Sequence, residues 1–569
     1  MLTRRDFLAA TVAAGTLCAG TGLPLRRLAA QGRLDQEQLL AFEPHGNVTL
    51  VHVTDIHAQL VPIYFREPSL NIGVGQAKGV VPHLVGAELR KAFNLSDKSA
   101  EAHAHTYDDF AELAGSYGRM GGLDRIATVI KSIRAARGDR MLLLDGGDTW
   151  TNSWTSLQTK GQDMVDAMNL LRPDAMTGHW EFTLGEARVK EIVDKLPHPF
   201  LAQNIRDSEF EDKVFEGSKI FERGGVRIAV IGQALPFTPI ANPRWMIPKW
   251  TFGIRERELR DEVAAVKAKG ADLVVLLSHN GFDLDRKLVQ EVPGIDVVLT
   301  GHTHDAVPRV TKVGTTLMVA SGSHGKFVSR LDLDVKSKSG EGGAIKGFRY
   351  RLIPVFSDAI KPDAEMAALI EKHRAPFAKE LGRVLGRTES LLYRRGNFDG
   401  TLDNVICDAI LAERDAEIAL SPGIRWGTSV LPGENITFED ITNGTAMTYP
   451  ACYRMKMTGE RLKEILEDVA DNIFHPDPYY QQGGDMVRSG GLGYTIDISK
   501  KVGSRISDMR LIKTGKPIDA GHEYVVAGWA SINQGTEGPP IWDVVAKHIE
   551  GRKVVSTKAL DSIKIVGAD

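Results

Sequence analysis

Apolar runs separated by helical and polar stretches recur along residues 46–360 of the 569-residue chain. Buried strands are predicted by the apolar runs at 48–53, 141–144, 226–230, 273–277 and 297–299. Between them, residues 121–136 and 256–269 repeat apolar side chains at helical spacing. Strands that alternate with helices in this way predict an α/β domain whose sheets are covered by helices.

Residues 60–118 interrupt this alternation and predict an insertion over the first strand–loop junction. His103 and His105 lie in it, and we expect both to be solvated loop residues. A linking helix is predicted within residues 361–385. The chain then continues into a predicted second, smaller α/β domain over residues 386–569.

Two helices are predicted in the second domain, at 402–412 and 458–468. A glycine-rich stretch, residues 481–491, follows them and is predicted to be a loop. Because loops held by a rigid scaffold often carry function, we expect this one to be more than a connection.

The first 30 residues have the pattern of an export signal. Paired arginines, Arg4 and Arg5, precede a short apolar run over residues 8–17, and small residues at 28–30 suit cleavage. This pattern resembles a twin-arginine signal, which predicts export of the folded protein to a bacterial periplasm. The apolar run is too short to span a bilayer, so we expect no membrane anchor.

Composition and charge fit a soluble globular protein and exclude some partners. Hydrophobic residues make up 43% of the chain and charged residues 25%, and the formal net charge of −3 gives no electrostatic basis for binding nucleic acid. Cys18 lies in the predicted signal, while Cys407 and Cys452 lie far apart in the sequence. We expect these two to be buried thiols, although an oxidising compartment would permit a disulfide.

Metal-type ligands follow predicted strands at four places in the α/β domain, and a fifth segment, residues 178–182, is expected to lie in the same row. These ligands are Asp55, His57, Asp148, His179, His279, His302 and His304. Sites in α/β sheets form beyond the carboxyl ends of strands, so the five loops should converge on one pocket. Imidazoles and carboxylates together bind borderline divalent cations, and one carboxylate can bridge two ions that activate a shared water. The pattern predicts a dinuclear metal centre with Asp148 as the bridge.

The order of these motifs resembles the calcineurin-like metallophosphoesterases, and the downstream domain resembles the C-terminal domain of 5′-nucleotidases. The matching downstream segments are residues 421–425, 457–460 and 488–491. Together the two resemblances cover nearly the whole chain after residue 30. They imply a four-layer, sandwich-like catalytic domain followed by a smaller α/β domain that binds the substrate.

Within that superfamily, residues 54–60, 178–182 and 481–488 resemble the SoxB family, the thiosulfohydrolases of bacterial sulfur oxidation. The resemblance implies two manganese ions, a metal that the residue types alone do not select. Site one would be formed by Asp55, His57, Asp148 and His304, and site two by Asp148, His179, His279 and His302. The implied partner is a SoxYZ-type carrier protein, whose cysteine on a swinging arm holds the substrate.

One loop departs from the nucleotidase pattern. Nucleotidases have Gly-Asn-His-Glu-Phe-Asp there, and the His and Asp form a dyad that assists the leaving group. Here the Asn position is His179, and the dyad positions are Trp180 and Thr183. An alkoxide leaving group needs a proton donor, whereas a thiolate or persulfide does not. Loss of the dyad therefore favours cleavage of a sulfonate from a persulfide carrier.

Residues of the second domain complete the expected site. Arg425 matches a family arginine that faces the anionic group of the substrate, and a guanidinium fork suits a sulfonate as well as a phosphate. Asp485 and Arg488 are candidates for lining a channel to the metals. With Asp148, His179 and Trp180, Arg425 would form the reacting centre. His324 could orient a ligand or serve the fold.

Three functions stay open at the level of the sequence. The first is hydrolysis of carrier-bound cysteine S-thiosulfonate to sulfate. The second is a periplasmic 5′-nucleotidase or cyclic-nucleotide phosphodiesterase, which would need a pocket for the base. Nucleotidases usually place a Pro-Phe pair there, and this chain has Tyr449 and Tyr453 nearby. The third is a non-catalytic binding protein that depends on its metals.

Overall fold

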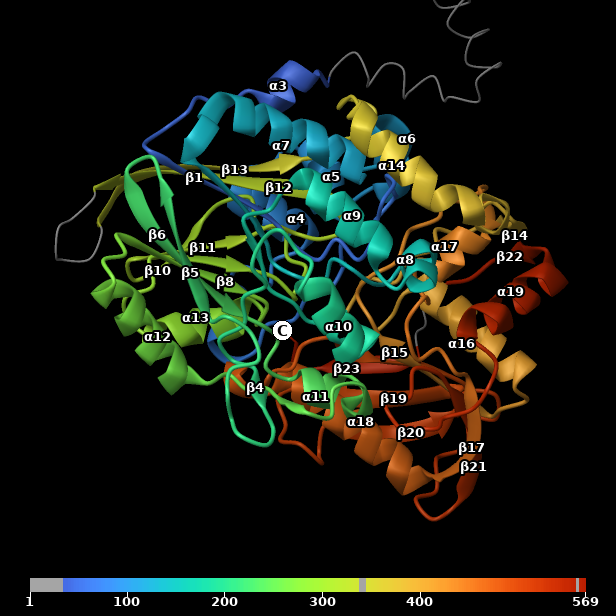
Figure 1. The fold of residues 1–569 in the computed structure, drawn as a ribbon. Helices are drawn as coiled ribbons and strands as arrows, with labels where there is room; N and C mark the ends of the chain where they lie inside the picture. The colour runs from blue at the N-terminus through green and yellow to red at the C-terminus, as the bar shows by residue number, and fades with distance from the viewer. Residues whose placement is uncertain (1–33, 337–343, 559–561, 569) are drawn as a thin grey trace, which may run out of the picture.

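The computed structural model describes residues 34–336, 344–558 and 562–568 (Figure 1). The predicted export signal therefore lies outside the described residues. No helix within these ranges is long and apolar enough to cross a membrane.

Two sheets form the centre of the catalytic domain. The first has the strand order β13-β12-β1-β2-β3, and the second has the order β10-β11-β9-β8-β6-β5. The strands of the first are β1 (Val48–Val53), β2 (Met141–Asp145), β3 (Ala175–Met176), β12 (Phe327–Lys336) and β13 (Ala344–Pro354). Those of the second are β5 (Ser218–Arg223), β6 (Val226–Gln233), β8 (Leu273–Ser278), β9 (Val297–Thr300), β10 (Thr311–Val313) and β11 (Thr316–Ala320).

Helices cover the outer faces of both sheets, so the domain has four layers (Figure 1). The first sheet is covered by α7 (Leu123–Arg137), α9 (Gln162–Leu171) and α14 (Ala364–Arg374), and the second by α12 (Glu256–Ala268) and α13 (Phe282–Glu291). Between the sheets, aliphatic side chains such as Leu50, Leu144 and Val275 form a fully buried core. This confirms the predicted α/β sandwich.

The insertion at residues 60–118 folds into α4 (Gly86–Phe93), α5 (Ala100–His105) and α6 (Phe110–Tyr117). The prediction that His103 and His105 are solvated is wrong. Both are buried, and their rings stack on Phe110 and Phe327 at centroid distances of 5.4 and 4.8 Å. Because α5 packs against the catalytic domain, its histidines serve the core and not the solvent.

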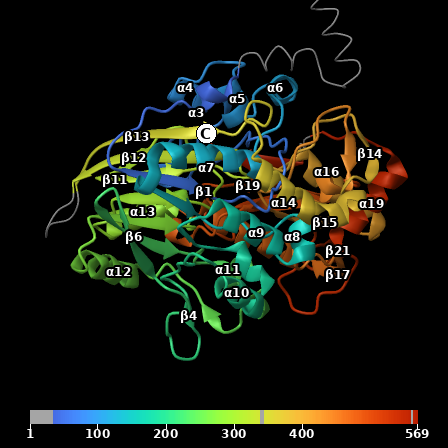
Figure 2. The ribbon, with the colours of Figure 1, turned by 45° about the horizontal axis from the view of Figure 1, so that its top comes forward.

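The predicted linking helix breaks at Pro376, which lacks the N–H that a helix interior requires. The break separates α14 from α15 (Ala378–Leu381) by the short turn Ala375–Phe377. In Figures 1 and 2, α14 runs beside α7 and α9 toward the second domain. The linker is therefore packed on the catalytic domain along its first part.

The C-terminal domain contains a four-stranded sheet of order β17-β21-β15-β18 and two three-stranded sheets. The four strands are β15 (Ile418–Gly423), β17 (Tyr453–Thr458), β18 (Asp485–Gly490) and β21 (Glu523–Gly528). The other strands are β14 (Val384–Thr388), β16 (Asn435–Thr437), β22 (Val554–Val555), β19 (Leu492–Asp497), β20 (Ile506–Leu511) and β23 (Ile563–Val566). Its main helices are α16 (Thr401–Glu413), α18 (Gly459–Phe474) and α19 (Ile541–Arg552).

The predicted glycine-rich loop is shorter than expected. Strand β18 takes most of it and pairs antiparallel with β15, which leaves residues 481–484 as the turn. Long-range pairing of this kind overrides local glycine content. Cys407 and Cys452 are free and buried, as expected for structural thiols, and burial raises the pKa of Cys452 to about 11.

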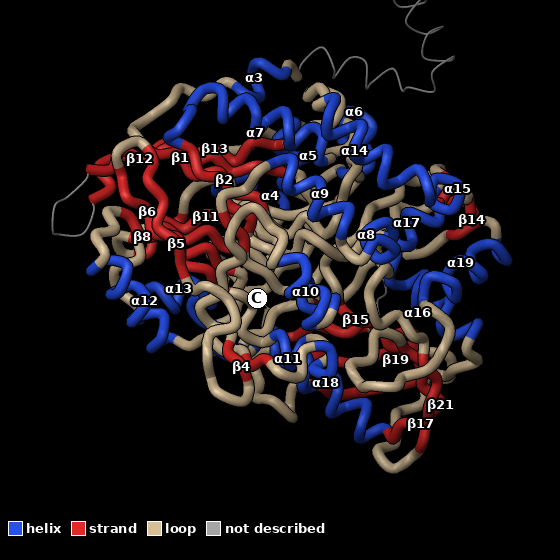
Figure 3. Tube along the Cα trace, in the orientation of Figure 1, coloured by secondary structure: helices blue, strands red, loops and turns tan. Residues whose placement is uncertain are grey.

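Aromatic side chains join the two domains. Trp154, at the start of α8 (Trp154–Thr159), packs edge-on against Phe438 and Trp542 at centroid distances of 5.0 and 5.4 Å. Figure 3 shows loops gathered between the strands of the catalytic domain and the C-terminal domain. The candidate site lies among these loops.

Candidate metal centre

The expected ligands all lie directly after strands of the two central sheets. Asp55 and His57 follow β1, Asp148 follows β2, His179 follows β3, His279 follows β8, and His302 and His304 follow β9. Strands β1, β2 and β3 are parallel, as are β8 and β9, so their carboxyl ends meet at one edge of the sandwich. The structure thus brings together all seven residues singled out in the sequence.

Five of these ligand residues have left-handed backbone conformations that are rare outside glycine. They are Asp55, His57, Asp148, His302 and His304, with φ between 51° and 73°. Such conformations cost free energy, and they persist only where the surrounding fold imposes them. Here they turn each side chain out of its strand direction toward a common centre.

The seven side chains divide into two groups that share Asp148. One group is Asp55, His57, Asp148 and His304, and the other is Asp148, His179, His279 and His302; within each, the ligand atoms lie within 4.8 Å of one another. The Oδ2 atom of Asp148 lies 3.2 Å from His179 Nδ1 and 3.1 Å from His279 Nε2. It also lies 3.9 Å from His57 Nε2. A carboxylate placed in this way can bridge two cations.

Several nitrogens in this cluster have the arrangement that a cation requires. The Nε2 atoms of His57 and His304 face each other at 2.9 Å, and His279 Nε2 faces Asp148 Oδ2 at 3.1 Å. Burial lowers the pKa of His302 and His304 well below the usual value, so both imidazoles are neutral and offer lone pairs. The residues therefore fit two divalent ions, and mixed N and O donors suit Mn²⁺, Zn²⁺ or Fe²⁺.

Two of the candidate ligands, His279 and His57, are held from behind by a hydrogen bond to their other ring nitrogen. His279 Nδ1 lies 2.6 Å from the carbonyl oxygen of Gly146, and His57 Nδ1 lies 3.2 Å from Asn152 Oδ1. These contacts fix the ring orientation and select the nitrogen that faces the centre. Asn152 had no recognisable signal in the sequence, since it is one of many polar loop residues.

Two further supporting residues hold the His179 loop. His179 Nε2 lies 3.1 Å from Asn242 Oδ1. The Glu181 carboxylate accepts backbone N–H bonds from His179 at 2.8 Å and from Thr149 at 2.6 Å. Glu181 lies in the same short motif as His179, two positions later, but the residue type alone does not indicate that it supports the loop. Asn242 lies too far along the chain for spacing to reveal it.

A cavity of about 380 Å³ opens onto the metal ligands between the two domains. Its walls include the ligand imidazoles on one side and, on the other, residues 423–426 and 482–484 of the C-terminal domain. Trp426 stacks on His57 with a centroid distance of 5.3 Å. The C-terminal domain therefore forms half of the cavity.

Arg425 reaches this cavity, as expected. Its guanidinium donates from Nη1 to the carbonyl oxygen of His302 and from Nη2 to that of Gly484, both at 3.0 Å. The side chain is buried, and burial lowers its pKa from the usual value. A guanidinium with five N–H donors keeps some for an anionic substrate group after these two bonds.

Trp180 forms an apolar wall of the cavity where nucleotidases place a histidine. It stacks parallel to Tyr449 at 6.1 Å and lies edge-on to Trp426 at 4.7 Å. Thr183 is buried and donates its hydroxyl to the carbonyl oxygen of Trp180 at 2.8 Å. Neither residue can donate a proton to a leaving group as an imidazole–carboxylate pair does.

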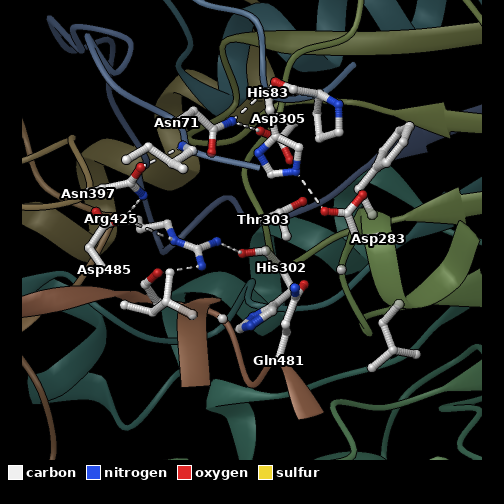
Figure 4. A pocket seen from close by; sticks show the side chains of 18 of the residues that line it. Asn71, His83, Asp283, His302, Thr303, Asp305, Asn397, Arg425, Gln481 and Asp485 are labelled. Atoms are coloured by element: carbon white, nitrogen blue, oxygen red, sulfur yellow. Dashed lines mark hydrogen bonds and ion pairs between the residues drawn. The ribbon is translucent and has the colours of Figure 1, made fainter. Parts of the chain in front are cut away.

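The two channel candidates do not line the metal cavity. Asp485 lines a neighbouring polar cavity of about 70 Å³, which shares His302 and Arg425 with the metal cavity (Figure 4). The prediction for Arg488 is wrong: it is buried and lies 3.2 Å from carboxylate oxygens of both Asp403 and Asp485. Because strand β18 turns Arg488 inward, it neutralises these buried acids instead.

His324 lies behind site one and is not among the ligands. Its ring is fully buried, 4.0 Å from Phe65 and 5.5 Å from His57 between centroids. Its backbone N–H donates to the carbonyl oxygen of Asp55 at 2.8 Å, and its Nε2 accepts from the N–H of Gly427 at 3.3 Å. It therefore supports the ligand loop and contacts the C-terminal domain.

Comparison with known proteins agrees with this architecture. The calcineurin-like phosphoesterase model matches residues 48–306, and the 5′-nucleotidase C-terminal domain model matches residues 384–546. A solved sulfate thiohydrolase SoxB from Thermus thermophilus, in complex with glycerol, is 34% identical; the match covers 93% of this chain and 98% of that one, with a TM-score of 0.88.

More distant relatives are nucleotidases. A 5′-nucleotidase precursor, also from Thermus thermophilus, is 22% identical, with 91% of this chain and 99% of that chain covered and a TM-score of 0.72, which shows the fold alone. Rat 5′-nucleotidase is 24% identical over 516 residues, covering 81% of this chain and 86% of the rat protein. With both domain models matched and the likeness to SoxB running almost end to end, the chain belongs to the calcineurin-like phosphoesterase family of hydrolases that carry a 5′-nucleotidase C-terminal domain.

Proposed function

We propose that the protein is a thiosulfohydrolase that releases sulfate from cysteine S-thiosulfonate on a SoxYZ-type carrier protein. The observation that carries the proposal is the replacement of the nucleotidase dyad by Trp180 and Thr183 beside a complete set of metal ligands. The likeness to SoxB supports it. We further propose export to the periplasm by the twin-arginine route.

The balance of the reaction accounts for the missing dyad. Water and R–S–S–SO₃⁻ give R–S–SH, SO₄²⁻ and one proton, and the bond that breaks joins the terminal sulfur to the persulfide sulfur. A simple thiol has a pKa of about 8.5, so its anion leaves without protonation far more readily than an alkoxide does. An enzyme for this substrate can therefore do without a general acid, and an apolar side chain such as that of Trp180 can occupy its position.

The residues of the cavity suit such a substrate. Two divalent cations, when bound to the seven ligands, would supply Lewis acidity and lower the pKa of a bound water, and manganese is the proposed metal. Arg425 is held by two carbonyl oxygens in an orientation that can bind a sulfonate. Trp180, Trp426 and Tyr449 line or back the apolar side, which excludes water and admits a narrow carrier arm.

The test compares two substrates on the same metal-loaded protein. We expect sulfate release from a carrier protein bearing cysteine S-thiosulfonate and little phosphate release from AMP. The His279→Ala variant, which lacks one expected ligand, is the control for metal dependence. Phosphate release without sulfate release would refute the proposal.

A 5′-nucleotidase is the second candidate, because the curated relatives have that activity. Tyr449 also stacks on Trp180 beside the cavity, and an aromatic pair could hold a nucleobase. The same assay separates the two, since only a nucleotidase would release phosphate from AMP at a substantial rate.

A further inference from the structure

We propose that the C-terminal domain is a structural part of metal site two, through the turn formed by residues 481–484. In this proposal the turn positions His302, so occupancy of site two and docking of the turn stabilise each other. The inference rests on the two-metal centre and not on the choice between sulfate and phosphate substrates.

The first observation is a hydrogen bond from a ligand ring to the other domain. His302 Nε2 lies 3.0 Å from the carbonyl oxygen of Gln482. A carbonyl only accepts, so Nε2 must carry the proton, and Nδ1 is then the atom that offers a lone pair. The backbone N–H of His302 donates to Asp55 Oδ1 at 3.0 Å, which fixes the start of the loop. Gln482 therefore selects the tautomer of a metal ligand.

Two arginines of the C-terminal domain hold the same ligand loop. Arg425 donates to the carbonyl oxygen of His302 and, with its other terminal nitrogen, to that of Gly484. Arg395 donates to the carbonyl oxygen of Thr303 at 3.1 Å. In Figure 4, the guanidinium of Arg425 lies beside His302, and Gln481 lies below His302. Three contacts from one domain thus hold a ligand loop of the other.

Gly483 lets the turn approach the ligand this closely. Its φ is +81°, and a Cβ there would lie 2.5 Å from His302 Nε2 and 3.0 Å from Arg425 Nη2. Gly484 has a similar φ of +85°, but its Cβ would meet only the carbonyl oxygen of Gly423 at 3.8 Å. Alanine at either position carries the same backbone strain, and only at Gly483 does it also displace His302.

The experiment compares Gly483→Ala with its matched control, Gly484→Ala. Each metal-free protein is titrated with Mn²⁺ by calorimetry, and the bound metal is counted after dialysis. We expect Gly484→Ala to bind two ions as the unaltered protein does. Gly483→Ala should bind the ion of site one normally and the ion of site two about 10- to 100-fold more weakly, the usual cost of losing a partner behind a ligand. Equal second-site affinities in the two variants would overturn the proposal.

A measurement on the unaltered protein guards against misfolding of the variants. Because coupling between two sites is reciprocal, filling site two should slow hydrogen exchange at the amides of residues 482–484. Exchange is measured with no ion, one equivalent and two equivalents of Mn²⁺. Protection that has appeared by the second equivalent, when site two is filled, supports the proposal, and unchanged exchange at both steps refutes it. Neither readout involves a substrate, so the outcome is independent of the proposed reaction.

Discussion

Restoring the nucleotidase dyad should increase the rate at which the protein hydrolyses phosphate esters with a poor leaving group. The change is Trp180→His together with Thr183→Asp. The introduced imidazole would face the metal cavity that Trp180 now lines, and the introduced carboxylate would lie one helical turn behind it. Because an alkoxide leaving group needs a proton, the pair should accelerate AMP hydrolysis by about 100-fold or more.

The structure also sets the cost of this change. Trp180 is 9% exposed and packs against Tyr449 and Trp426, so replacing the indole by a smaller ring should destabilise the fold by about 3 kcal/mol, near the lower end for loss of a buried tryptophan. Domains are stable by about 5–15 kcal/mol, so the variant should stay folded. The buried Thr183→Asp carboxylate needs the new imidazole as its partner, so Thr183→Asp alone should be less stable than the pair.

The assay compares two phosphate esters. Phosphate release from AMP requires a protonated leaving group, whereas release from p-nitrophenyl phosphate does not, because that phenolate leaves readily as an anion. We expect the double variant to release phosphate faster from AMP but not from p-nitrophenyl phosphate. Each single variant should hydrolyse AMP only slightly faster than the unaltered protein. Metal content and thermal unfolding serve as controls. Two results would refute the idea that the dyad serves to protonate the leaving group. One is an equal increase in the hydrolysis rate of both esters, and the other is no increase in a double variant that is folded and metal-loaded.

Three further predictions concern the metal centre and the thiols. Asp148→Asn should lose both ions and His279→Ala only one, since Asp148 belongs to both ligand groups; elemental analysis of dialysed protein checks this, and unchanged metal content in Asp148→Asn would disprove the bridge. Burial alone lowers the pKa of His279, but the carboxylates of Asp148 and Asp55 raise it to about 10. In the metal-free protein this proton stabilises the fold below the ordinary pKa of histidine, and the contribution is lost as pH rises toward 10. Metal must displace that proton, so calorimetry in two buffers at about pH 8 should show proton release on binding, and its absence would contradict the assignment. Burial raises the pKa of both Cys407 and Cys452, so neither should react with a thiol reagent until the protein unfolds; rapid labelling of the native protein would be the contrary result.

Local sequence patterns were sufficient to predict the strands and helices whose apolar residues recur at regular spacing. The run Val48–Val53 is strand β1, and the stretch predicted at 121–136 is helix α7 within two residues at each end. The same patterns located the candidate metal ligands, because parallel strands that are buried on both faces end at one edge of a sheet. A ligand directly after such a strand is thereby placed without knowledge of the rest of the fold.

Residues whose role depends on distant partners could not be assigned in this way. His103 and His105 lie in a segment that the sequence predicts to be a solvated insertion, yet α5 packs both rings against aromatic side chains. Arg488 lies within a glycine-rich stretch that resembled a loop, but pairing with β15 makes it part of a strand, and its charge faces buried acids. For His105 and Arg488, the deciding partners Phe327 and Asp403 lie far along the chain.

The sequence by itself determined the fold class, from the alternation of strands and helices along the chain. It also determined the seven candidate ligands and the residues at the dyad positions, Trp180 and Thr183, because these depend on residue type and on position after a strand. Only the tertiary structure decided which atoms face the centre. Asn242 behind His179 and the Gln482 carbonyl behind His302 lie 63 and 180 positions away from the ligands they orient. Such contacts form when the two domains and their loops pack together, and no local pattern of residues encodes that geometry.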